Sequence, residues 1–310
     1  MARNPTRRRP VLSRYLDPRT LNRIDRLSLS AKLVVEGFMA GAHRSPYHGF
    51  SVEFAQHREY TQGDDPRHLD WKLYAKAGRY FIKQYEVETN LVAHILYDCS
   101  ESMDYASPRV PWTKREYASY LTATLSYLIV SQADAVGAAL FHSEIASYLE
   151  PRQSMSQVNR ICEELERAGT APRTDTGAVL HRLAERIKRR GLIILISDLL
   201  DRSEHILAGL DHMRFARQEV VVFHVLDPYE LDFPFEGQVY FEGLEFAGDA
   251  LCQPRRLRQD YLDNLRRHVL TIRAACERNL ADYLLLRTDQ PLEVALAGFL
   301  HSRSLRQWHR

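Results

Sequence analysis

The chain has 310 residues, of which 45% are hydrophobic, and a formal net charge of +2 at pH 7. This length and composition can bury one large core, or a core with a smaller module. The near-neutral charge gives no reason to expect nucleic acid or an anionic membrane as a partner. The four cysteines form no Cys-x-x-Cys pair, and no apolar run approaches the ~18 residues that span a bilayer. We therefore expect a cytoplasmic protein without a membrane span.

The first part of the chain predicts a smaller module that precedes the main domain. Residues 1–20 are basic and interrupted by prolines, which predicts a flexible tail. Residues 21–88 are expected to form an N-terminal helix and strand module, and residues 89–310 the main domain. A helical pattern covers Pro18–Phe38, and strand patterns cover Gly49–Ala55 and Tyr80–Val87.

A segment rich in charged and aromatic residues, Arg58–Trp71, lies between these two strand patterns. Its central residues, Gly63 to Pro66, are typical of a turn. The acids Asp64, Asp65 and Asp70 form a possible second acidic site. We favour a turn held by Arg–Asp pairs, with the Trp71 side chain in the core.

From residue 89 onward, hydrophobic strands alternate with amphipathic helices. This alternation predicts an α/β fold with a doubly wound, mostly parallel sheet. Two helix starts carry a capping-box pattern, Thr113 with Glu116 and Ser154 with Gln157. The segment Asp227–Cys252 is expected to be a loop. Strands are expected at 91–97, 135–141, 145–149, 192–196, 220–226 and 283–286. Further helices are expected between the segment 172–177 and Gly191, and at 206–213, 255–278 and 292–300.

The first strand of this domain ends in an acid and two hydroxyl residues at alternate positions, Asp98, Ser100 and Ser102. Residues two apart project to the same side of an extended chain, so their oxygen atoms can converge. Hard oxygen ligands suit Mg²⁺, Mn²⁺ or Ca²⁺ and not zinc. An ordinary turn is the alternative interpretation of this short pattern taken alone.

Two further segments carry oxygen side chains to the same region. Asp198 follows the very hydrophobic strand at 192–196, and Thr174 precedes a helix. In open α/β sheets, ligands bind beyond the carboxyl ends of the strands. The sequence therefore predicts a metal site at one edge of the sheet, formed by Asp98, Ser100, Ser102, Thr174 and Asp198.

The pattern Asp98-x-Ser100-x-Ser102, followed by Thr174 in Thr-Asp-Thr-Gly and then Asp198, resembles the metal-ion-dependent adhesion site of von Willebrand factor type A domains. The resemblance covers about residues 90–290. It implies a type A-like, Rossmann-like fold and a divalent ion that binds a carboxylate of a partner protein. Related domains often carry two glycines where this chain has Pro172-Arg173.

The stretch from Glu53 to Tyr85, together with Arg258-x-x-Tyr261-Leu262, is similar to the signature of domain-of-unknown-function family 58. That family is typically encoded beside MoxR-type AAA+ ATPases. The resemblance implies an adaptor that couples such an ATPase to a client protein. We therefore expect a metal-dependent interaction module and no enzyme, with a client or ATPase that offers a Glu or Asp carboxylate.

Two alternatives differ from this interpretation in the role of the oxygen cluster. A Mg²⁺-dependent phosphohydrolase of the haloacid dehalogenase type would need a second Asp as general acid where this chain has Ser100. A type A-like scaffold with a degenerate site would bind no metal. Neither a Gly-x-x-x-x-Gly-Lys loop nor a Gly-x-Ser-x-Gly elbow occurs, and a nucleic-acid role would depend on the arginine-rich tail alone.

Overall fold

The computed structural model describes residues 52–60, 69–87, 91–171, 174–241, 250–292 and 294–296. The chain divides into two compact units. One unit is Glu36–Asn90, and the other combines Met1–Val35 with Leu91–Arg310. The expected tail at 1–20 and the expected helix at 18–38 lie outside the described residues.

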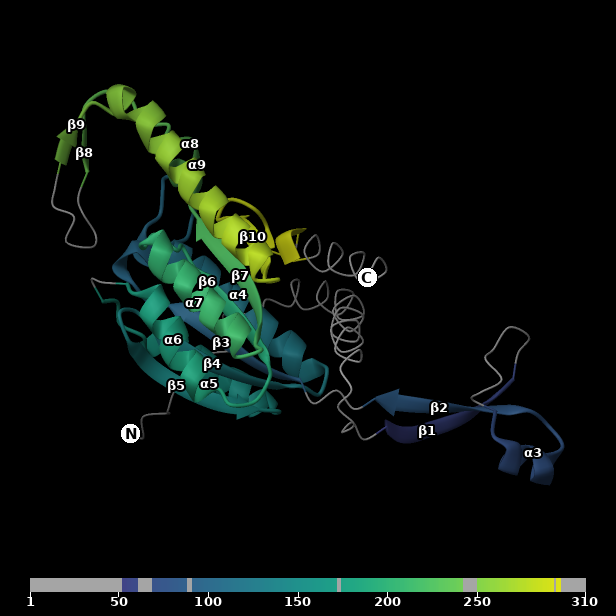
Figure 1. Ribbon diagram of the computed structural model, residues 1–310. Helices are drawn as coiled ribbons and strands as arrows, with labels where there is room; N and C mark the ends of the chain where they lie inside the picture. Colours follow the sequence, from purple (N-terminus) through teal and green to yellow (C-terminus); the bar gives the residue numbers. More distant parts are fainter. Residues whose placement is uncertain are drawn as a thin grey trace, which may run out of the picture. The chain divides into compact units, whose positions relative to one another are not determined.

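The unit Glu36–Asn90 contains an antiparallel pair of strands, β1 (Val52–Glu59) and β2 (Phe81–Val87). The short helix α3 (Trp71–Ala77) precedes β2 in the chain (Figure 1). Asp70 stabilises the start of α3, because its Oδ1 accepts a hydrogen bond from the Leu73 amide at 3.1 Å. The rings of Tyr74 and Tyr80 stack with centroids 4.4 Å apart.

The prediction that Trp71 lies in the core is wrong. Its side chain is 61% exposed, and its ring meets Tyr74 edge-on with centroids 6.3 Å apart. The reason is that Trp71 is the first residue of α3 and not the end of a turn. Asp70 acts as a helix cap, whereas Asp64 and Asp65 lie outside the described residues.

The second unit contains a six-stranded sheet with the strand order β10-β7-β6-β3-β4-β5. All neighbouring strands run parallel except β5, which pairs antiparallel with β4 at one edge. This confirms the predicted doubly wound, mostly parallel α/β fold. The strands are β3 (Val92–Asp98), β4 (Ala135–Phe141), β5 (Ile145–Arg152), β6 (Leu192–Ser197), β7 (Glu219–Leu226) and β10 (Asp282–Arg287).

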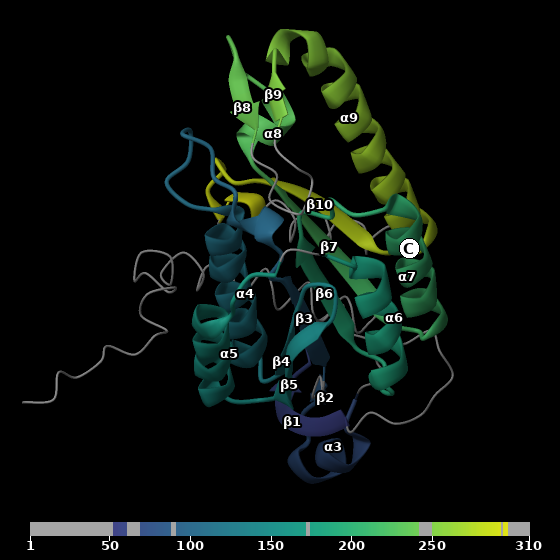
Figure 2. The same ribbon diagram turned by 90° about the vertical axis from the view of Figure 1, so that its left-hand side faces the viewer.

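Helices cover both faces of this sheet (Figures 1 and 2). On one face lie α4 (Lys114–Ser131) and α5 (Met155–Arg167). On the other face lie α6 (Thr176–Arg186), α7 (Ser203–Phe215) and α9 (Pro254–Arg278). Two layers of helices bury the inner strands β3, β4, β6 and β7 on both faces, which explains why these strands are nearly continuously hydrophobic in the sequence. The edge strand β5 keeps exposed residues.

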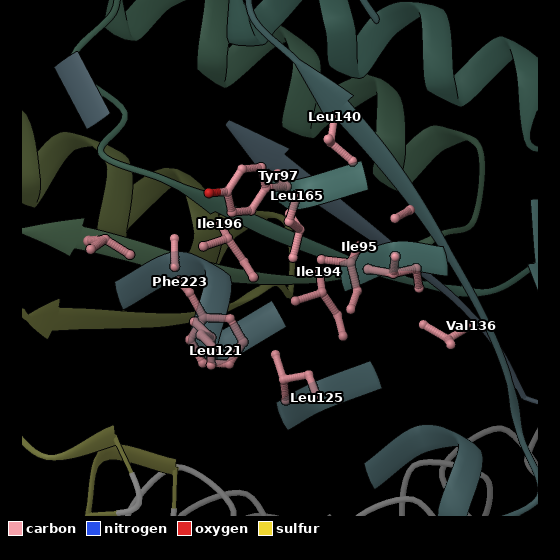
Figure 3. Packing of buried hydrophobic residues seen from close by; sticks show 14 of the residues in the cluster. Ile95, Tyr97, Leu121, Leu125, Val136, Leu140, Leu165, Ile194, Ile196 and Phe223 are labelled. Carbon is pink, nitrogen blue, oxygen red and sulfur yellow. The ribbon is translucent and has the colours of Figure 1, made fainter. Parts of the chain in front are cut away.

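The side chains of β3 alternate between two hydrophobic clusters. Ile95 and Tyr97 belong to the cluster that includes Leu121 and Leu125 of α4, seen in Figure 3. Leu96 belongs to the opposite cluster, with residues of α6, α7 and α9. Each fully buried aliphatic side chain contributes about 1.5–3 kcal/mol, so the central strand is firmly held at the position where the candidate site begins.

Two local predictions differ from the structure, and one agrees with it. The capping box of Thr113 and Glu116 is present at the start of α4. Ser154 makes no side-chain capping bond, and its hydroxyl instead lies 2.9 Å from that of Ser156. The buried Gln157 side chain donates to the Glu150 carbonyl at 2.9 Å, so neither half of the expected capping box forms. The expected loop at 227–252 contains α8 (Pro228–Asp232), β8 (Val239–Phe241) and β9 (Ala250–Cys252).

Helices α6 and α7 approach each other closely at two glycines. A Cβ atom added to Gly177 would lie 2.5 Å from the carbonyl oxygen of His205, and one added to Gly209 would lie 2.8 Å from the Cβ of Leu180. Both distances are shorter than the 3.0 Å that real Cβ atoms keep from other heavy atoms. The absence of a side chain at these positions therefore allows the two helices to pack in direct contact.

We predict that Gly177→Ala lowers the free energy of unfolding by about 1–3 kcal/mol, because the added methyl group forces α6 and α7 apart. Chemical denaturation of the full chain measures this change. Gly169→Ala is the matched control, since a Cβ atom there meets nothing within 4 Å. An equal loss of stability in both variants would contradict the prediction.

Candidate metal centre

The ends of β3 and β6 bring Asp98 and Asp198 to the same edge of the sheet. The two strands are parallel neighbours in which Tyr97 pairs with Ile196. The Ser197 hydroxyl donates a hydrogen bond to Asp98 Oδ2 at 2.5 Å, and the Ser100 amide donates to Asp98 Oδ1 at 2.9 Å. The side chain of Asp98 is completely buried, so its orientation is fixed from both sides.

The two predicted hydroxyl groups converge beside this carboxylate. The Oγ atoms of Ser100 and Ser102 lie 3.0 Å apart, and the Ser102 hydroxyl is also hydrogen-bonded to Asp198. A short 3₁₀ helix, η2 (Glu101–Asp104), follows Ser100 and directs the chain away from the sheet. Four of the five predicted oxygen residues are therefore joined in one hydrogen-bonded cluster.

Thr174, the fifth predicted residue, belongs to a segment that lies beside the same motif. Ala171 forms a parallel bridge with Ser100, and the Glu101 amide donates to the Ala171 carbonyl at 3.1 Å. Thr174 directly precedes Asp175, the N-cap residue of α6. These contacts place the segment that carries Thr174 beside the cluster.

A buried lysine that the sequence analysis did not predict contacts this cluster. Lys114, the first residue of α4, has 0% side-chain exposure. Its Nζ donates to Asp198 Oδ2 at 2.8 Å and to Glu230 Oε1 of α8 at 2.6 Å. The Asp198 carboxylate therefore already has a cationic partner within the protein.

The two carboxylates differ in their electrostatic environment. Burial, followed by the charge of Asp198, raises the pKa of Asp98 to about 7, although Ser197 and Ser100 donate hydrogen bonds to it. Burial also opposes the charge of Asp198, but the ammonium of Lys114 holds the pKa of Asp198 below its usual range. Within the described residues, Asp198 thus has a cationic partner, whereas Asp98 is held by hydrogen bonds from Ser197 and Ser100 and forms no ion pair.

The donor set fits a hard divalent cation on the Asp98 side of the cluster. One carboxylate and two hydroxyls are oxygen ligands of the type that Mg²⁺ accepts, with water completing the coordination. The incompletely compensated charge of buried Asp98 is consistent with a bound cation. In the part of the chain that the structure describes, no group of three or more His, Cys, Asp or Glu residues could hold a metal ion, so such a site depends on the two serines.

Two sequence signals point to the residues that were missed. A cation in the first turn of a helix is unfavourable because the helix dipole is positive there, so Lys114 directly after the cap Thr113 requires acidic partners. Asp227 and Glu230 form a second capping box around Pro228, a pattern that the sequence shows plainly. Which acid reaches Lys114 still depends on the tertiary fold.

The fold and the site define a doubly wound α/β domain with a buried oxygen cluster at the carboxyl edge of its sheet. A sequence model of the family described as "Protein of unknown function DUF58" matches residues 56–271. The match covers more than half of the chain. The protein therefore belongs to this family, which confirms the resemblance seen in the sequence.

Known relatives and solved structures add names but no activity. The chain is 25% identical over 297 residues to the uncharacterized protein Rv1480 of Mycobacterium tuberculosis and to Mb1516 of Mycobacterium bovis, covering 93% of this chain and 90% of each relative. Among solved structures, BatB from Bacteroides thetaiotaomicron aligns with 15% identity, 70% of this chain, 99% of that chain and a TM-score of 0.44. The SpRpn10 VWA domain aligns with 11% identity, 68% and 95% coverage and a TM-score of 0.37.

None of the helices within the described ranges is both long enough and apolar enough to cross a membrane.

We predict that Ser197→Ala lowers the free energy of unfolding of the metal-free protein by about 1–3 kcal/mol, because it removes a donor from buried Asp98. Urea denaturation in the presence of EDTA measures this change. Ser131→Ala is the control, since the Ser131 hydroxyl donates to the Tyr127 carbonyl on an exposed turn. An equal decrease in the free energy of unfolding in both variants would contradict the prediction, because the buried bond to Asp98 would then stabilise the fold no more than an exposed one.

Proposed function

We propose that this protein is an interaction module that docks a partner protein through a divalent ion at Asp98, Ser100 and Ser102. The observation that carries this proposal is the convergence of one buried carboxylate and two hydroxyls 3.0 Å apart at the carboxyl edge of the sheet. Ligands of doubly wound sheets bind at this edge. The proposed ion is Mg²⁺, with Mn²⁺ or Ca²⁺ as close substitutes.

The residues of the cluster have separate roles in this proposal. Asp98 contributes the strongest ligand, and Ser197 keeps its carboxylate in a fixed orientation. Ser100 and Ser102 contribute neutral oxygens, which add no negative charge. When bound, the ion would supply an open coordination position for an acidic side chain of the partner. Binding then needs no bond-breaking step.

The proposed partner is a MoxR-type AAA+ ATPase, or a client protein that this chain presents to the ATPase in the cytoplasm. Membership of family 58 supports this choice, because the resemblance to that family implies an adaptor for such ATPases. A Glu or Asp side chain of the partner would complete the coordination of the ion.

We predict measurable, weak binding of Mg²⁺ or Mn²⁺ that Asp98→Ala abolishes, because this change removes the proposed carboxylate ligand. Isothermal titration calorimetry on the full chain measures the affinity. Asp104→Ala is the matched control, since Asp104 lies in the same segment but forms an ion pair with Arg115 at 2.6 Å. Unchanged affinity in Asp98→Ala would refute the metal assignment.

A second experiment tests the docking step with the purified ATPase as the probe. We predict that the ATPase binds the wild-type chain in Mg²⁺, and that EDTA or Asp98→Ala weakens this association at least about tenfold, a loss of 1.4 kcal/mol. Association that resists both treatments would show an interaction that does not use the ion.

Two competing functions make different predictions. A scaffold with a degenerate site is favoured by the contact of Lys114 with Asp198 at 2.8 Å, and it would show no metal binding in wild type.

For the phosphohydrolase alternative, we predict that pure wild type hydrolyses no generic phosphate ester. We further predict that Ser100→Asp binds the ion more tightly but binds its partner less tightly, because the added charge satisfies the ion. Metal-dependent turnover by wild type that is lost in Asp98→Asn would overturn the docking proposal.

A further inference from the structure

Lys114 places a permanent positive charge inside the candidate metal centre. We propose that this ammonium holds Asp198 as an internal counter-ion, confines a divalent ion to Asp98, Ser100 and Ser102, and thereby limits its affinity. The inference rests on the proposed metal-dependent function and adds a residue that controls it. Lys114 is not proposed as a metal ligand, because a protonated amine has no free electron pair. It acts through its positive charge and its position.

The contacts of Lys114 show that its charge cannot leave the cluster. Its side chain has no exposure, and its two acidic partners, Asp198 and Glu230, are only 2% and 14% exposed. The ring of Tyr105 also faces the ammonium, with its centroid 5.9 Å from Lys114 Nζ. A lysine enclosed in this way does not exchange its partners for water, so its charge acts on the centre at all times.

The position of Lys114 at the start of α4 makes the two acids indispensable. The free amide groups of a helix N-terminus carry partial positive charge, which opposes an ammonium at the first helical residue. Asp198 and Glu230 therefore stabilise an otherwise unfavourable placement. One oxygen of the Asp198 carboxylate, Oδ2, therefore accepts a hydrogen bond from Lys114 and is less available as a ligand for a metal ion.

Asp198 is also the link between Lys114 and the proposed ligands. The hydroxyl of Ser102 is hydrogen-bonded to the same carboxylate that accepts from Lys114. The ammonium of Lys114 and the hydroxyl of Ser102 thus contact the same carboxylate. Like charges repel strongly in a water-poor site, so Lys114 weakens the binding of a divalent ion beside Ser102.

A double variant isolates this effect without changing the formal charge of the cluster. Wild type has three carboxylates, Asp98, Asp198 and Glu230, and one ammonium, Lys114. Lys114→Met with Glu230→Gln leaves two carboxylates and no ammonium, so the formal sum is the same. Any gain in metal affinity then comes from the release of Asp198.

The experiment measures Mg²⁺ binding to the full chain by calorimetry, together with the shift in melting temperature that Mg²⁺ causes. We expect the double variant to bind Mg²⁺ at least about tenfold more tightly than wild type, and to gain more thermal stability from it. Arg115→Met with Asp104→Asn removes a neighbouring ion pair and is expected to leave the affinity unchanged. Equal or weaker binding by the double variant would overturn the inference.

A milder variant keeps the test valid if the double variant does not fold. Glu230→Gln removes one of the two negative charges that compensate Lys114. Lys114 stays paired with Asp198, and its positive charge then repels a nearby divalent ion more strongly. We expect at least about threefold weaker Mg²⁺ binding, whereas Lys114→Arg, which keeps the charge, should bind as wild type does. Unchanged affinity in Glu230→Gln would overturn the inference.

The same titrations separate this inference from the proposed function. If wild type binds Mg²⁺ through Asp98 but the double variant binds no more tightly, the inference alone fails. If wild type shows no binding and the double variant binds, the inference is supported and the metal-dependent function of wild type fails. If neither binds, both are overturned.

Discussion

Two carboxylates, Asp98 and Asp198, end neighbouring strands inside the protein, and the surrounding structure depends on how their charges are compensated. A buried anion without partners costs far more than a surface charge. Asp98 receives a hydroxyl and a backbone amide, whereas Asp198 receives the ammonium of Lys114. The start of α4 and the position of α8, through Glu230, are coupled to this requirement. The site and the fold are therefore stabilised by the same contacts.

The hydrogen-bonding arrangement gives the cluster two unlike halves. On the Asp198 side, ammonium and carboxylate form a closed network. On the Asp98 side, hydroxyl oxygens and a carboxylate are gathered, and the part of the chain that the structure describes brings no ion pair to Asp98. Such an asymmetric pair of acids is a common way to obtain different chemistry from the same residue type. In the proposed function, the ion would bind on the Asp98 side, while Lys114 keeps its contact with Asp198 on the other side.

The fold class and the convergence of Asp98, Ser100 and Ser102 could be predicted from the sequence, because both depend on local patterns. The alternation of strands and helices determined the fold class, and the spacing of Asp98, Ser100 and Ser102 indicated their convergence. Lys114 could not be assigned to Asp198, because the two residues are 84 positions apart and only the tertiary fold joins them. Trp71 was misplaced because aromatic size favours burial on average, while a helix start at Asp70 decided its actual exposure.

The close packing of α6 and α7 at Gly177 and Gly209 has a consequence for recognition. Both helices begin just after segments that carry predicted ligands, Thr174 and Asp198, and the Thr176 amide donates to Asp201 in the loop before α7 at 3.1 Å. Helices in backbone contact cannot slide independently, so the start of α6 and the residue Asp201 before α7 keep a fixed relation to each other. A partner that binds at this edge would meet a preorganised surface and lose little conformational entropy in ordering it.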